Sequence, residues 1–218
     1  MNWENKKVAI CYRGHYFRNN PPKNSNFFSC QENHHNFLYQ YLGDYDIFFH
    51  TYPVDTESDS RLVDLVNPTN YVFENMQPGT PVINSICKVC ELVSGYDFII
   101  NLRFDLLFLK SFDHFNVDDE KFNFLWKERK DFWEADRWTS DLMYAFNGNF
   151  LESFKSSLEP ASTDYYNTRK YPHSSSSAHF VYKYLGVDES SINFMVDGHH
   201  PSGTEQKANG FIEINRSL

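Results

Sequence analysis

An Arg-x-Asp triplet, Arg103-Phe104-Asp105, follows a nearly continuous apolar run at residues 98–102. Such a run is typical of a strand that is covered on both faces. Asp105 could bind a hard divalent cation, because Mg²⁺ and Mn²⁺ take carboxylate oxygens and complete their shell with phosphate and water. Arg103 projects to the same side of an extended segment and could bind a phosphate or orient Asp105. The alternative is a structural ion pair at a strand end.

A second candidate phosphate site lies in the turn after the first predicted strand. Arg13 and Gly14 follow that strand directly, and Arg18 comes four residues later. Guanidinium forks match phosphate oxygens, whereas the alternative is that these are loop arginines in surface ion pairs. The sequence has no Gly-x-Gly-x-x-Gly and no Gly-x-x-x-x-Gly-Lys pattern, which disfavours a dinucleotide-binding fold and a P-loop ATPase.

Two further groups could perform proton or metal chemistry. Asp141 stands just before a predicted strand, and a carboxylate near a cleft can accept a proton from a hydroxyl; it could equally be a turn signal. Asp197, His199 and His200 form a compact cluster, and imidazole with carboxylate suits Mn²⁺ or Zn²⁺. The alternative for this cluster is a polar loop with incidental histidines.

The elements that must position these residues alternate in the first half of the chain. The patterns predict strands at 7–12, 45–50, 71–74 and from 96, and helices at 32–42, 58–66 and 81–93. The second half is less regular, with predicted strands at 121–126 and 142–146, helices at 149–158 and 177–185, a polar stretch at 156–176, and a short strand with a polar loop at 192–214. The alternation predicts an α/β fold with a mostly parallel, doubly wound sheet. The turn after the first strand and the end of the fourth then lie at the same sheet edge.

Composition bounds the class of protein. The 218 residues suit a single domain, 1–218, and the formal charge of −9 argues against a general nucleic-acid binder. The spacing of Cys87 and Cys90 occurs in metal and redox sites, but no second pair accompanies it, so buried thiols in a reducing compartment are expected. The sequence has neither a signal-peptide core nor an apolar run of the roughly 20 residues that a membrane span needs. We therefore expect a cytoplasmic protein, in the host cytoplasm if the source is a virus.

Five segments together resemble a known family. They are VAICYRGHYFR, FFHTY, YDFIINLRFDLLF, SDLMYAFNGNFLESF and INFMVDGHH. In this order they resemble the small GT-A-like glycosyltransferases of microbial polysaccharide biosynthesis and of large DNA viruses of algae. The resemblance implies a single GT-A-like, Rossmann-like domain that binds a nucleotide-sugar donor and, with Mn²⁺ or Mg²⁺, transfers the sugar to a hydroxyl of a glycan or glycoprotein.

The same resemblance implies roles for the candidate residues. Residues 1–112 would bind the nucleotide sugar, and residues 113–218 would carry the acceptor site and a metal loop. The donor-binding candidates are Arg13, Gly14, Arg18, His50, Lys88 and Arg103. The metal candidates are Asp105, Asp197, His199 and His200, and Arg103 stands where the family has the first acid of an Asp-x-Asp motif. Asp141 would deprotonate the acceptor in an inverting reaction, or position substrate in a retaining one.

Two other functions fit parts of the sequence. A non-catalytic nucleotide- or glycan-binding module of a viral or cell-surface assembly would bind its ligand without releasing a diphosphate. A nucleotidyltransferase would need a glycine-rich phosphate loop after the first strand, and Arg13-Gly14-His15 is too poor in glycine for that.

Overall fold

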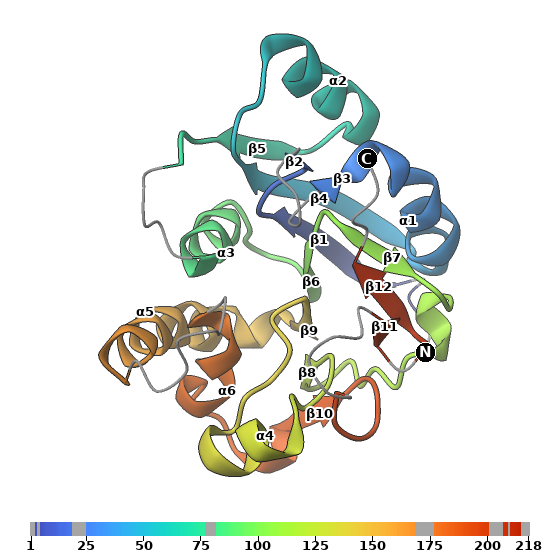
Figure 1. Cartoon of the computed structure of the whole chain (residues 1–218). Coiled ribbons are helices and arrows are strands. Elements are labelled where there is room, and N and C mark those ends of the chain that lie inside the picture. Colours follow the sequence, from blue (N-terminus) through green and yellow to red (C-terminus); the bar gives the residue numbers. More distant parts are fainter. Residues whose placement is uncertain are drawn as a thin grey trace.

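Seven strands form the central sheet of the protein. Their spatial order is β10 (Ile192–Phe194), β8 (Phe122–Phe124), β9 (Met143–Asn147), β6 (Phe98–Arg103), β1 (Lys7–Arg13), β4 (Asp44–Thr51) and β5 (Asn70–Phe73) (Figure 1). All neighbours are parallel except β9, which runs antiparallel to both β6 and β8. The structure, a computed structural model, describes residues 3, 5–18, 25–76, 82–168, 177–200, 207–208 and 210–214.

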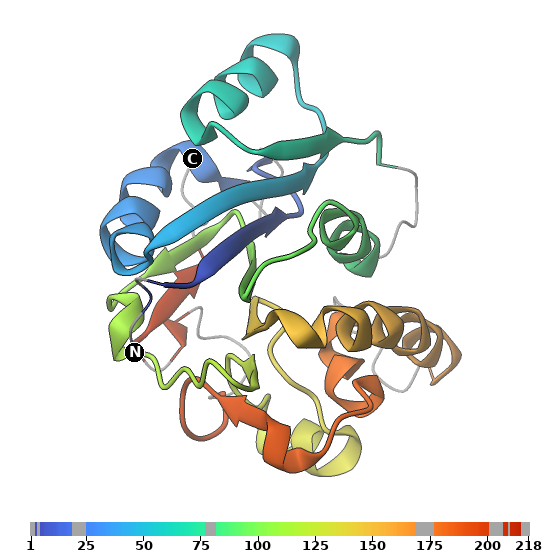
Figure 2. The ribbon, with the colours of Figure 1, turned by 180° about the vertical axis from the view of Figure 1, so that it is seen from behind.

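Helices cover both faces of this sheet. Helices α1 (Gln31–Phe37) and α2 (Thr56–Val66) pack on one face, and α3 (Val82–Glu91), α5 (Leu151–Thr168) and α6 (Val181–Tyr184) pack on the other (Figures 1 and 2). Strand β1 shows why both faces are apolar: Val8, Ile10 and Tyr12 enter the first core, whereas Ala9 and Cys11 enter the second. The predicted α/β class with a mostly parallel sheet is confirmed.

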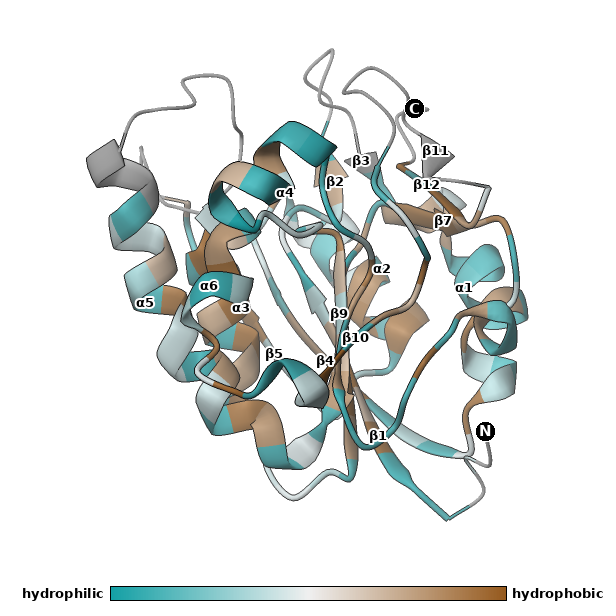
Figure 3. Ribbon diagram, turned by 90° about the horizontal axis from the view of Figure 1, so that it is seen from below, coloured by the Kyte–Doolittle hydropathy of each residue, from teal (hydrophilic) through white to brown (hydrophobic). Residues whose placement is uncertain are grey.

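The helices carry one buried and one polar side, as their patterns predict. In Figure 3, hydrophobic residues (brown) and hydrophilic residues (teal) both occur on α3, α5 and α6. Helix α2 begins where the Asp55 carboxylate accepts the Ser58 backbone N–H at 2.8 Å, and it ends at Asn67 in the left-handed region. Helix α1 is shorter than predicted, because a 3₁₀ turn at Tyr39–Tyr41 replaces its last part.

A second, three-stranded sheet follows the Arg-x-Asp triplet and was not predicted. Strand β7 (Leu106–Phe108) pairs with β12 (Ile212–Ile214), which pairs with β11 (Lys207–Ala208). Helix α1 holds β7 from the other side, because the Asn33 side chain bonds both backbone groups of Phe108 at 2.7 and 2.8 Å. The segment directly after Asp105 is therefore anchored on both sides.

The second half of the chain departs from the sequence patterns at two places. Helix α5 was predicted to end at residue 158, but it continues through Pro160 to Thr168, and residues 169–176 of the predicted polar stretch lie outside the described residues. Leu158 and Ala161 are fully buried in the second core, and this packing outweighs the local cost of the proline. Helix α4 (Lys130–Asp136), which is seven residues long, was not predicted. Residues 177–185 contain the expected helix as a 3₁₀ turn, Ser177–Phe180, followed by α6.

The environment of the four cysteine thiols indicates a structural role. Cys11, Cys30 and Cys90 are buried, Cys87 is half-buried, and none of the four forms a disulfide bond. Burial raises the pKa of Cys90 to about 12, so this thiol stays protonated and unreactive. Among the described helices, none has the length and apolar character that would let it cross a membrane.

Candidate active site at the carboxyl edge of the sheet

The predicted site residues of three strands lie in one row across the carboxyl edge of the sheet. In the register of the parallel strands, Arg13 is opposite His50 of β4 on one side and opposite Arg103 of β6 on the other. The Arg103 backbone N–H donates to the Leu142 carbonyl at 3.2 Å, which brings Asp141 to the end of this row. The carboxyl ends of parallel strands are where open α/β sheets bind their ligands.

Arg103 and Asp105 form a bidentate ion pair. The guanidinium Nε donates to one carboxylate oxygen at 2.8 Å, and a terminal nitrogen donates to the other at 2.5 Å. The Asp105 side chain is 4% exposed and that of Arg103 is 24% exposed. Burial by itself lowers the pKa of Arg103, but the Asp105 carboxylate, with a smaller contribution from Asp141, raises it above the usual value.

Arg13 is opposite Arg103 in the strand register and is almost fully buried. Its Nε donates to the Asn101 side chain at 2.8 Å, and a terminal nitrogen donates to the backbone carbonyl of Asp141. The guanidinium also lies over the Tyr144 ring, 5.9 Å from its centroid. Burial lowers the pKa of Arg13, as does the like charge of Arg103, while Tyr144 and Asp141 oppose this. Arg13 therefore ties β1 to β6 and to the segment that carries Asp141.

The turn at Gly14 is held by a buried polar network from β4 and α3. Gly14 has a φ of +87°, its N–H donates to the Ser85 hydroxyl at 2.9 Å, and its carbonyl accepts from Thr51 at 2.8 Å. His50 completes the network, with Nδ1 2.8 Å from the Ser85 hydroxyl and Nε2 3.0 Å from Glu74. Burial lowers the pKa of His50, so its neutral form is favoured. His50 thus helps to position the Gly14 turn through the Ser85 hydroxyl, which accepts the Gly14 N–H.

Lys88, also a predicted donor-binding residue, lies on α3. Its ammonium group pairs with Glu91 at 3.4 Å. Burial is the main cause of the lowered pKa of the neighbouring His50, and the charge of Lys88 lowers that pKa further. The Lys88 side chain is 38% exposed. Its role in binding a donor stays a prediction.

Arg18 and His15 extend the row along the chain that leaves β1. Arg18 ends the short strand β2 (Phe17–Arg18); burial lowers its pKa, as does the charge of Arg103. Burial also lowers the pKa of His15 to about 4, with Arg18 adding to the effect. The His15 Nε2 atom is buried without a hydrogen-bond partner, and the His15 ring contacts that of Tyr52 at 4.7 Å.

Asp141 is buried beside two groups that the sequence analysis did not single out, His179 and Glu128. The His179 Nδ1 donates to the Thr139 carbonyl at 2.7 Å and lies 3.9 Å from a Glu128 oxygen. Burial by itself lowers the pKa of His179, but Asp141 and Glu128 together raise it above the usual value. Neither residue belongs to a recognisable spacing. Glu128 lies between β8 and α4, and His179 lies in the 3₁₀ turn before α6, so the fold alone brings both to Asp141.

The late cluster lies against the segment between β8 and α4. The His199 Nδ1 donates to the Glu128 carbonyl at 2.8 Å, and the His200 ring stacks on Trp126 with centroids 5.2 Å apart. Asp197 is exposed. One ring nitrogen of His199 and one ring face of His200 are therefore already engaged in contacts within the protein.

The predicted metal ligands do not fit a preformed metal centre. Both oxygens of Asp105 accept hydrogen bonds from Arg103. Within the ranges that the structure describes, no group of three or more His, Cys, Asp or Glu side chains lies close enough to share an ion. A hard cation needs several oxygen ligands, so the described side chains by themselves are a poor match for Mn²⁺ or Mg²⁺. Metal binding stays a prediction.

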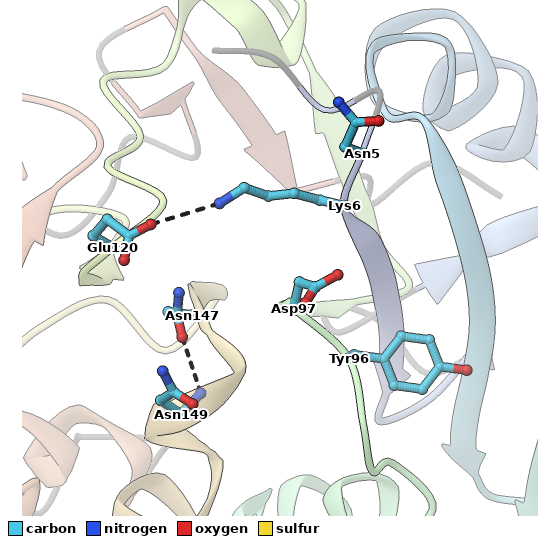
Figure 4. A pocket seen from close by; sticks show the side chains of 7 residues that line it. All are labelled: Asn5, Lys6, Tyr96, Asp97, Glu120, Asn147 and Asn149. Carbon is cyan, nitrogen blue, oxygen red and sulfur yellow. Dashed lines mark hydrogen bonds and ion pairs between the residues drawn. The ribbon is translucent and has the colours of Figure 1, made fainter.

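A polar hollow of about 320 Å³ lies at the opposite edge of the sheet. Asp97 precedes β6, Asn147 ends β9, and Lys6 precedes β1 and points toward Glu120 (Figure 4). The side chains mostly satisfy one another: Lys6 pairs with Asp119 at 2.5 Å, Asp97 accepts the backbone N–H of the first residue of β1, and Asn147 caps the following turn. This hollow is therefore a weaker candidate than the carboxyl edge.

Comparison with solved structures defines the class of fold. No protein-family model matches the sequence, and no curated protein sequence matches it. The glycosyltransferase GlyE of Streptococcus pneumoniae TIGR4 superposes with a TM-score of 0.50 and 14% identity over 88% of this chain and 46% of GlyE. The galactosyltransferase LgtC, solved with donor and acceptor sugar analogues, gives a TM-score of 0.52 and 10% identity over 86% of this chain and 72% of LgtC.

The fold is thus that of GT-A glycosyltransferases. The chain spans about half the length of GlyE. At these identities the comparison concerns the fold, and the activity has to be argued from the residues of the site.

Proposed function

We propose that this chain is a glycosyltransferase that moves a sugar from a nucleoside diphosphate donor to a hydroxyl group of a glycan or glycoprotein. The observation that carries the proposal is the row of Arg13, Arg103 and Asp141 at the carboxyl edge of the sheet. It places the Arg103 guanidinium, for a diphosphate, near the Asp141 carboxylate, for a proton, and the buried Arg13 joins their segments in a GT-A fold.

The residues would divide the reaction between them. The bond between the anomeric carbon and the diphosphate oxygen breaks, and the diphosphate leaves with the bonding electron pair. Arg103, with Arg18 beside it, faces this developing negative charge, and fixed positive groups stabilise such charge strongly where water is excluded. The acceptor oxygen bonds to the anomeric carbon, and its proton passes to the Asp141 carboxylate in the inverting form of the reaction. In a retaining form Asp141 positions the substrate instead.

Metal assistance by Mn²⁺ or Mg²⁺ is the prediction from sequence that the described residues support least. A bound cation would supply Lewis-acid stabilisation of the leaving diphosphate. Both oxygens of Asp105 are bonded to Arg103, so a cation at Asp105 would have to displace these bonds.

The proposal is tested by incubating the protein with a panel of nucleotide sugars and acceptor glycans and measuring the nucleoside diphosphate released. Asp141→Asn keeps the size of the side chain and the carbonyl that Arg13 binds, and it should lower turnover by at least about 100-fold. Asp64→Asn is the matched control, because Asp64 is exposed on α2, and it should retain full turnover. Nucleotide binding with no diphosphate release by the unmodified protein would instead identify a non-catalytic binding module.

A further inference from the structure

We infer that Arg103 supplies the positive charge that the donor diphosphate needs, so that the nucleotide binds without a divalent cation. This inference rests on the proposed function, since it concerns the same site.

The pair of Arg103 and Asp105 presents its positive partner outward. The Arg103 side chain is 24% exposed, whereas the Asp105 side chain is only 4% exposed. A ligand that approaches from solvent therefore meets the arginine first. Asp105 acts as the group that fixes the guanidinium plane, through two hydrogen bonds of 2.8 and 2.5 Å.

A cation at Asp105 would have to compete with this arrangement. Each of the two bonds joins charged partners, and such bonds are among the stronger ones in proteins. Displacing them would also leave the Arg103 guanidinium next to the incoming cation, which adds like-charge repulsion. The described residues provide no carboxylate–imidazole group of three that would compensate.

The surroundings of Arg103 favour an anion. Arg13 and Arg18 are both close enough that the charge of Arg103 lowers their pKa values, in addition to the larger effect of burial. The carboxylates of Asp105 and Asp141 offset part of this positive charge. The chain as a whole carries −9, so this gathering of like charges at a strand edge is a local exception. A bound diphosphate relieves their mutual repulsion.

The chemistry of the group fits a diphosphate. A guanidinium is planar, stays charged at every working pH, and binds two phosphate oxygens at once. Arg103 is preorganised by Asp105, so little side-chain freedom is lost when the ligand binds. The same charge remains in place when the leaving diphosphate becomes more negative.

The test is titration calorimetry with a nucleoside diphosphate, in excess EDTA and again with Mn²⁺. We expect dissociation constants that agree within about threefold in the two conditions. Arg103→Gln should weaken binding by about 10- to 100-fold in EDTA. Arg61→Gln, an exposed arginine of α2, should leave binding unchanged.

A second variant changes the charge of residue 103 from positive to negative. Arg103→Asp places a second carboxylate next to that of Asp105, which is a ligand pattern for a hard cation, and binding should then appear only with Mn²⁺. Thermal unfolding of each variant shows that it is folded.

The outcomes separate the two proposals. Binding by the unmodified protein that is lost in EDTA and restored by Mn²⁺ overturns the inference and leaves the proposed function standing. Equal binding by Arg103→Gln and the unmodified protein also overturns it. Failure of every nucleoside diphosphate to bind in either condition refutes the proposed function itself, and the inference with it.

Discussion

Replacing His34 with glutamine is expected to make the protein more resistant to acid unfolding. His34 is fully buried on α1, where its Nδ1 lies 2.6 Å from the Tyr12 hydroxyl and its Nε2 donates to the Leu106 carbonyl at 2.6 Å. Burial lowers the pKa of His34 to about 4, although the Leu106 carbonyl and Asp105 act in the opposite direction. The folded protein therefore holds this imidazole neutral. A glutamine side chain offers an acceptor and a donor for similar partners but does not titrate.

The sign and size of the effect follow from linkage. The unfolded chain binds a proton at His34 below its usual pKa near 6.5, while the folded protein does not until about pH 4. The contribution of the neutral His34 to the free energy of unfolding is therefore complete above about pH 6.5. It falls as the pH drops below that value, and the fall ends below about pH 4. At pH 5 the loss from this one group is about 2 kcal/mol relative to pH 7.5. A domain of this kind is stable by about 5–15 kcal/mol in total, so the change is measurable.

The assay is urea unfolding followed by tryptophan fluorescence at pH 7.5 and pH 5.0. The loss of unfolding free energy between the two pH values should be about 2 kcal/mol smaller for His34→Gln than for the unmodified protein. The other titrating groups, His15 among them, contribute equally to both proteins and cancel in the difference. His35→Gln changes the exposed neighbour on the same helix and should lose as much stability as the unmodified protein. An equal loss for His34→Gln and the unmodified protein would refute the account of His34 as a buried neutral group.

Three other substitutions test the packing that positions the site. Pro160→Ala should raise the free energy of unfolding by about 1–3 kcal/mol, because Pro160 is exposed inside α5; a loss in urea unfolding would contradict this. Asn123→Leu should lower it by at least about 3 kcal/mol, since the Asn123 amide donates to three backbone carbonyls at 2.8–3.0 Å; a change below 1 kcal/mol would be inconsistent with that role. Gly148→Ala should cost about 3 kcal/mol or more, because a Cβ there would overlap the Tyr96 carbonyl oxygen. The control is Gly95→Ala, where an added Cβ meets no atom. This substitution should lower the free energy of unfolding by only about 1 kcal/mol, because of the φ of +75°, and an equal loss for both variants would contradict the overlap at Gly148.

Sequence patterns were most informative where one face or both faces of an element are buried. The strand at 98–103 and the helix at 82–91 were predicted because a buried element needs a long apolar run or a regular apolar spacing. The alternation of such elements predicted the sheet, and the sheet edge then predicted which turns would meet. The patterns failed where the structure depends on distant partners. Strand β7 exists because β12 pairs with it from about a hundred residues away, and α5 passes Pro160 because its buried face continues.

The same division holds for the candidate site. The sequence alone determined that arginines and acids would follow the ends of adjacent strands, because strand ends and turns are local features of the pattern. Only the tertiary structure decided that Arg13 is enclosed while Arg103 is partly open, and that the Asp105 carboxylate bonds to Arg103. Burial and pairing depend on what the other strands and helices cover, and the charge that a ligand meets depends on both. That is why the role of the Arg-x-Asp triplet follows from the fold and not from its spacing.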